Sequence, residues 1–166
     1  RDYKVTGVQT CALPIWSIEG EAGRARAVEA YESSIDAAVE FIDEGLAHAV
    51  GEVGRPHWKV SDDVWALSNQ LLASTMARAA KQGFALQLHV EGESDATYPE
   101  LAEMADRAGF PRDRLVRHYA PADVRDQATH GIVPSVLCGQ GALPVLLETM
   151  EAASGGFLLE TDHMDD

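Results

Sequence analysis

Four residues with metal-binding side chains each stand at the end of a short apolar run: Glu52, His89, His118 and Asp162. Carboxylate oxygens and imidazole nitrogens are typical ligands of divalent ions such as Zn²⁺ and Mn²⁺. One histidine in such a place is more often a packing residue, whereas four potential ligands at four run ends favour a shared site. The sequence therefore predicts a divalent metal centre, if the fold brings these four ends together.

The apolar runs are predicted to be β-strands that alternate with helices. Apolar residues recur every three or four positions between 20 and 45, which indicates an amphipathic helix. Ser61 begins a second helix that runs to Gly83, and Thr97 with Glu100 has the spacing of a capping box for a third. Shorter helices are expected near 124–128 and 142–153. Strands are expected at about 46–52, 84–90, 114–119, 131–137 and 156–162, although Pro134 is unusual inside a strand.

Alternating strands and helices predict an α/β fold with right-handed parallel units. Parallel strands place their carboxyl ends at one edge of the sheet, which is where (β/α)8 barrels keep their chemistry. An open, doubly wound sheet and part of a (β/α)8 TIM barrel both fit this pattern. In either fold the four candidate ligands lie at the same edge.

Three features together resemble the TatD family of metal-dependent hydrolases, which belongs to the amidohydrolase superfamily. They are the string Gly51-Glu52-Val53-Gly54, the strand-end residues His89 and His118, and the string Leu158-Leu159-Glu160-Thr161-Asp162. The Glu-Thr-Asp string is fairly specific, whereas Gly-Glu-x-Gly is shared with neighbouring barrel hydrolases. The resemblance runs from about residue 20 to the end. It implies a partial (β/α)8 barrel with about the fourth to eighth strands.

The resemblance also implies roles for the candidate ligands. In the family, the glutamate corresponding to Glu52 bridges two metal ions, the histidines corresponding to His89 and His118 hold one of them, and the last aspartate, Asp162 here, binds the other. The implied cofactors are two divalent ions, Mg²⁺, Mn²⁺ or Zn²⁺. The implied reaction is hydrolysis of a phosphodiester, in DNA or a smaller substrate, with Asp162 as the candidate general base.

Five further residues are weaker candidates for this site. Gln87 and Glu160 lie one layer below the ligands and are expected to orient them, the alternative being a polar layer without catalytic consequence. Arg55 follows the Glu52 strand and is a candidate contact for a substrate phosphate, the alternative being a surface-loop residue. His57 and His163 are expected near the ligands. We expect no such part for His48, His130, Ser135 and Cys138.

The first fifteen residues are expected to be foreign to the fold. Residues 5–15 match the translation of a common sequencing adapter, and residues 1–4 are expected to share that origin. Residues 16–166 are then an incomplete barrel domain. The family's first strand ends in His-x-His, which this chain lacks, and a proline soon after Asp162 is also missing. We therefore expect a fragment with unpaired sheet edges that binds metal weakly and has little or no turnover.

Composition limits the possible partners. Thirteen basic and 27 acidic residues give a net charge of -14, which repels polyanions and leaves no basic stripe for a DNA backbone. Two cysteines and no long apolar run favour a cytoplasmic protein without a membrane span or evident protein partner. Two alternatives stay open: a related enzyme acting on an amide, ester or lactone, and a non-catalytic barrel scaffold.

Overall fold

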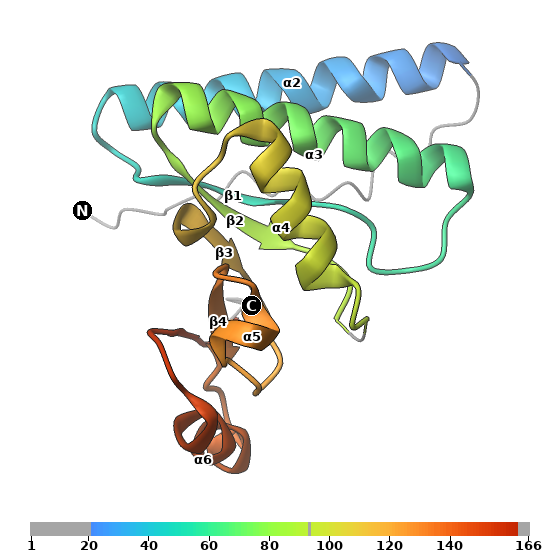
Figure 1. The fold of residues 1–166 in the computed structure, drawn as a ribbon. Coiled ribbons are helices and arrows are strands. Elements are labelled where there is room, and N and C mark those ends of the chain that lie inside the picture. The colour runs from blue at the N-terminus through green and yellow to red at the C-terminus, as the bar shows by residue number, and fades with distance from the viewer. Residues whose placement is uncertain (1–20, 93, 163–166) are drawn as a thin grey trace.

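A computed structural model describes residues 21–92 and 94–162 of the chain (Figure 1). Helices and strands alternate through these residues, as the sequence predicts. The helices are α2 (Glu21–Asp43), α3 (Asp62–Gln82), α4 (Thr97–Ala108), α5 (Asp126–Thr129) and α6 (Leu143–Ala152), with a short 3-10 turn, η1 (Arg112–Arg114). The strands are β1 (Ala49–Gly54), β2 (Ala85–His89), β3 (Leu115–Arg117), β4 (Val133–Leu137) and β5 (Leu158–Glu160).

All five strands are parallel, and their order in the sheet is their order in the chain, β1-β2-β3-β4-β5. A doubly wound sheet reverses its strand order at a switch point, whereas a (β/α)8 barrel adds each strand beside the last. The observed order is that of a barrel segment. Figure 1 shows α2, α3 and α4 forming a helical layer over β1 and β2, with α6 at the far end of the sheet.

The hydrophobic core is concentrated under the first three helices. One large cluster joins α2, α3 and α4 to the first strands and includes the fully buried Leu72, Met76, Leu86 and Leu101. A second cluster, near β4, has only three buried members, Ala120, Val124 and Val136. The last helix and strand are therefore thinly covered, and Leu143, Leu147, Met150, Leu158 and Leu159 are exposed.

The element boundaries differ from the prediction in ways that affect the site. The first strand begins at Ala49 and continues to Gly54, so Glu52 lies inside β1 rather than at its end. His89 is the last residue of β2, while His118 and Asp162 follow β3 and β5 by one and two residues. Pro134 lies inside β4, opposite Arg117 of β3.

The predicted helix caps form differently. Thr97 already belongs to α4, and its hydroxyl donates to Glu91 instead of capping the helix. Ser61 has the extended backbone of an N-cap residue, but its hydroxyl donates to the side chain of Asp63. In the part of the chain that the structure describes, no helix is long and apolar enough to cross a membrane.

Candidate metal centre

Three of the four predicted ligands meet at the carboxyl edge of the sheet. Glu52, His89 and His118 come from three neighbouring strands, and one potential ligand atom of each lies within 4.8 Å of the others. His118 is buried, whereas Glu52 and His89 are half-buried, so solvent reaches one side of the site. A carboxylate and two imidazoles at this spacing are a donor set that suits a divalent ion.

A bulge in β1 places Glu52. Val50 pairs with Leu86 and Val53 pairs with Leu88, so that Gly51 and Glu52 together face a single residue of β2. A bulge of this kind bends the strand and turns one side chain away from the regular alternation. Glu52 therefore reaches the centre from within the strand.

Both glycines of the Gly-Glu-Val-Gly string are required by close packing against β2. A Cβ atom on Gly54 would lie 1.8 Å from the carbonyl oxygen of His89, and one on Gly51 would lie 2.9 Å from the Cβ of Gln87. Distances this short leave no room for a side chain, so β1 comes this close to β2 only with glycine at both positions. The string thus has a local structural cause as well as a place beside the ligand.

Glu52 lies between the two imidazoles. Its Oε2 is 3.1 Å from Nδ1 of His89, and its Oε1 is 3.3 Å from Nε2 of His118. The hydrogen bond with His89 lowers the pKa of Glu52, and the same bond raises the pKa of His89. Each carboxylate oxygen faces one imidazole, so the carboxylate lies between the two rings.

Glu160 stands behind His118. Its Oε2 is 2.9 Å from Nδ1 of His118, close enough for an ion pair although the ring is turned off the line of a good hydrogen bond. The Ser135 hydroxyl donates to Oε2 at 2.6 Å, and the backbone N–H of Tyr119 donates to Oε1 at 2.6 Å. The carboxylate is thus fixed from two sides. Sequence reasoning gave Ser135 no role, because the contact joins β4 to β5.

Asp162 lies beside the three ligands and is more open to solvent. Its Oδ1 is 4.0 Å from Nε2 of His118, and its side chain is 47% exposed. Its backbone φ is 45°, and Tyr119, next to His118, has a φ of 55°. Left-handed backbone at residues other than glycine is uncommon and is concentrated at functional sites. Of the three such residues in the described part of the chain, two lie at or beside predicted ligands, and the third, His130, follows α5.

His57 also reaches the centre. Its Nδ1 lies 3.0 Å from Nε2 of His89, and partial burial, together with the nearby charge of His89, lowers the pKa of His57. A neutral imidazole at this distance is a potential further ligand or substrate contact. His163, the other histidine expected here, lies outside the described residues.

Arg55 is not a surface-loop residue, and the sequence-based alternative that placed it in such a loop is wrong. It is 4% exposed, and its guanidinium pairs with both oxygens of Glu91. It also pairs with Glu100 at 2.8 Å and donates to Asn69 at 3.0 Å. The guanidinium is thus held by protein groups on several sides.

The remaining sequence candidates lie in different surroundings. Gln87 is half-buried against Gly51, and among the described residues no hydrogen bond joins it to His89. His48 is exposed ahead of β1, and His130 ends α5. Cys138 has a free, half-buried thiol, and its backbone N–H donates to the carbonyl of Glu160 at 2.7 Å.

Comparison with known proteins gives one family and one distant relative. The sequence model of a family described as "TatD related DNase" matches residues 21–165. An uncharacterised protein of the archaeon Methanocaldococcus jannaschii is 36% identical over 117 residues, which are 70% of this chain and 40% of that protein. The chain thus spans about two fifths of that relative's length. No solved structure matches the chain.

Proposed function

Because the chain belongs to the TatD-related DNase family, we propose that it supplies one side of a metal-dependent phosphodiesterase centre, with Glu52, His89 and His118 as metal ligands. The observation that carries the proposal is the position of Glu52 between two imidazoles at the carboxyl edge of the sheet. In a (β/α)8 barrel this edge is the catalytic one.

The donor set fits a divalent ion of the Mg²⁺, Mn²⁺ or Zn²⁺ class, and two ions are proposed for a complete site. When bound, such an ion lowers the pKa of a water molecule and draws charge from the phosphoryl oxygens. By the resemblance Glu52 would bridge the two ions, and its two carboxylate oxygens at this edge are the pair of donors that such a role needs. Asp162 binds the second ion in this proposal.

Asp162 is also the proposed general base. Its carboxylate is solvent-accessible and close to His118, so an attacking water can reach its oxygens, and the proton of that water passes to Oδ1 or Oδ2. Glu160 orients His118 by facing its Nδ1, which leaves Nε2 directed at Glu52. Gln87 lies opposite the bulge, and in this proposal its amide helps to orient the neighbouring ligands. Gln87→Leu removes the amide and is expected to weaken metal binding, and an unchanged affinity would remove this role.

Two alternative functions remain, one that keeps the metal ligands and one that does not. A substrate with an amide, ester or lactone bond would use the same ligands, and the net charge of -14 is a reason to retain a small substrate beside DNA. By resemblance, relatives that cleave such bonds often carry a carbamylated lysine where this chain has Glu52, which favours a phosphodiester. A non-catalytic scaffold is the third candidate, and it predicts no metal binding.

Metal binding by the 166-residue chain tests the ligand assignment. Calorimetric titration with Mn²⁺ and with Zn²⁺ should show weak binding that Glu52→Gln abolishes. Glu103→Gln is the matched control, because Glu103 is exposed on α4 and pairs with Arg107 one turn away. Equal binding by the wild type and the Glu52 variant would contradict the assignment.

Turnover tests the reaction class. The chain alone is expected to hydrolyse little, and a form extended by the upstream sequence of the gene is expected to cleave bis(p-nitrophenyl) phosphate and single-stranded DNA with Mg²⁺, Mn²⁺ or Zn²⁺. Faster cleavage of p-nitrophenyl acetate than of the phosphodiester would favour the ester alternative. An extended form that binds no metal would favour the scaffold.

A further inference from the structure

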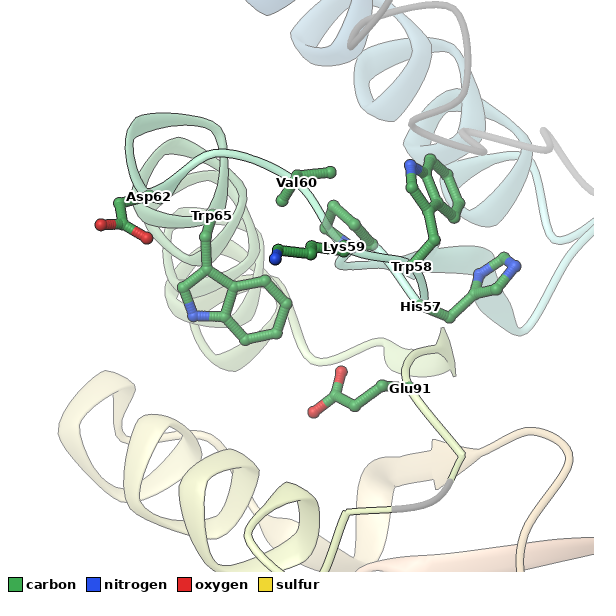
Figure 2. A pocket seen from close by; sticks show the side chains of 8 residues that line it. His57, Trp58, Lys59, Val60, Asp62, Trp65 and Glu91 are labelled. Atoms are coloured by element: carbon green, nitrogen blue, oxygen red, sulfur yellow. The ribbon is translucent and has the colours of Figure 1, made fainter.

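An open pocket of about 390 Å³ lies next to the proposed metal centre (Figure 2). The loop after β1 forms one side, the beginning of α3 forms another, and Glu91 lies opposite that loop. Two of the chain's three tryptophans line it. The lining residues are Pro56, His57, Trp58, Lys59, Val60, Asp62, Trp65 and Glu91.

His57 connects this pocket to the metal centre. His57 is one of the lining residues, and its Nδ1 lies 3.0 Å from Nε2 of His89. On its other side the ring meets Trp58 edge-to-face, with 4.7 Å between centroids. The pocket therefore begins one side chain away from a proposed metal ligand, within reach of a substrate bound there.

One wall of the pocket is held rigidly. The guanidinium of Arg55 lies over the Trp65 ring at 4.6 Å from its centroid and is paired with Glu91. This contact fixes the plane of the indole. It also offsets part of the negative charge of Glu91, since Arg55 is shared with Glu100.

The pocket also carries a cation. Figure 2 shows the side chain of Lys59 extending across the pocket towards Trp65. Within the described part of the chain Lys59 has no ion-pair partner, although the exposed carboxylate of Asp62 also lines the pocket. On a chain with a net charge of -14, a lysine that points towards an indole and has no ion-pair partner among the described residues is an unusual local arrangement. Flat rings and a cation together suit a ligand with a flat ring and an attached anionic group.

We propose that this pocket is a subsite for a nucleobase, in which the base stacks on the exposed indole of Trp58, with Trp65 on another side of the pocket, while Lys59 pairs with a neighbouring phosphate. Base–aromatic stacking accepts any base and strengthens binding to single-stranded substrate without reading sequence. Trp58 is 36% exposed and so is available for this contact. The inference rests on the proposed function for its catalytic meaning, and it names the part of a phosphodiester substrate that the centre holds.

Binding of thymidine 5′-monophosphate and of 2-deoxyribose 5-phosphate to the whole chain tests the subsite. The second probe has a hydroxyl group at C1 in place of the base, and EDTA in the buffer removes any contribution of metal. Calorimetry should give a dissociation constant at least about fivefold lower for the nucleotide. Trp58→Ala should remove that difference and Trp58→Phe should retain most of it. The control is Phe41→Ala, because Phe41 is 45% exposed on α2 and does not line the pocket.

Ring-current shifts give a second readout that a general loss of stability does not imitate. The base protons of the nucleotide should move upfield with the wild type and less with Trp58→Ala. Equal affinity for the two probes, no binding of the nucleotide, or an equal loss of both probes in Trp58→Ala would overturn the subsite. These results leave the metal titration of Glu52→Gln unaffected, so failure of the subsite and failure of the proposed function are separate outcomes.

Discussion

Glu52 reaches two histidines because its neighbours are small. The bulge at Gly51 and Glu52 needs β1 and β2 to lie closer than side chains would allow. The bulge sets the direction of the carboxylate, and the glycines make the bulge possible. Substitutions at these glycines should therefore affect the centre without removing any ligand.

Gly54→Ala should be strongly destabilising. The added Cβ would lie 1.8 Å from the carbonyl oxygen of His89, so the backbone of both strands must shift. We expect a loss of about 3 kcal/mol or more in the free energy of unfolding. Urea denaturation measures it, with Gly92→Ala as control, because a Cβ on Gly92 meets nothing within 4 Å. Equal stability of the two variants would show that the close approach is not required.

Glu160→Gln should weaken metal binding while the chain stays folded. The neutral amide keeps the size of the side chain but loses the charge that faces Nδ1 of His118. Loss of such a supporting carboxylate typically lowers metal affinity about 10- to 100-fold. Titration with Zn²⁺ measures it, and Glu148→Gln on the exposed side of α6 is the control. An unchanged affinity would leave Glu160 as a packing residue.

At the scale of elements, Arg55 and Glu91 join the loops that follow β1 and β2. Arg55 comes three residues after Glu52, and Glu91 comes two residues after His89. The ion pair between Arg55 and Glu91 therefore joins the two loops just beyond two proposed ligands. The backbone N–H of Arg55 also donates to the carbonyl of His89 at 3.2 Å. Next to them, the buried Arg117 donates to the carbonyls of Glu91 and Gly92. The loop after β2 is therefore held by Arg55 on one side and by Arg117 on the other.

Arg55→Ala should cost about 2–3 kcal/mol in the free energy of unfolding, because it leaves Glu91 and Glu100 without their shared cation. The value is below the roughly 3–5 kcal/mol typical of a fully buried pair, since both carboxylates retain contact with water. Arg55→Lys should recover part of it, because lysine keeps the charge but not the two-pronged geometry. The matched control is Arg78→Ala, whose exposed pair with Asp36 should contribute at most about 1 kcal/mol. Equal losses at the two positions would contradict a stabilising role for the ion pairs of Arg55 with Glu91 and Glu100.

The sequence predicts the order of the elements and the residues that gather at their ends. The sequence predicts that His89 and His118 lie together because parallel strands end at one edge, a rule that needs no knowledge of side-chain packing. It does not predict the bulge that turns Glu52 towards the histidines or the burial of Arg55. Both depend on contacts between residues 14 to 37 positions apart, and local periodicity does not report these.

In the whole molecule, the β1 side of the sheet is covered by α2, α3 and α4, whereas the β5 side has few buried apolar contacts. The surface of α6 and β5 carries six exposed apolar side chains: Leu143, Val145, Leu147, Met150, Leu158 and Leu159. A large exposed apolar surface on a single chain favours association, and β5 adds a strand edge that can pair with another chain.

We expect the 166-residue chain to self-associate as its concentration rises. Light scattering after size-exclusion chromatography should show a rising average mass, and the double variant Leu143→Lys with Met150→Lys should lower it. Leu46→Lys is the control, since Leu46 is 61% exposed but lies ahead of β1, away from this surface. A wild type that stays monomeric throughout would contradict the expectation.

The uneven core has a consequence for the order in which the chain opens. Glu52 and His89 are anchored in the large cluster, whereas Glu160 and Asp162 belong to the part held by three buried residues. Amide hydrogens of β5 should therefore exchange by local opening well before those of β2. An ion bound by residues from both parts would couple their opening, so its binding free energy would mainly protect the weaker half.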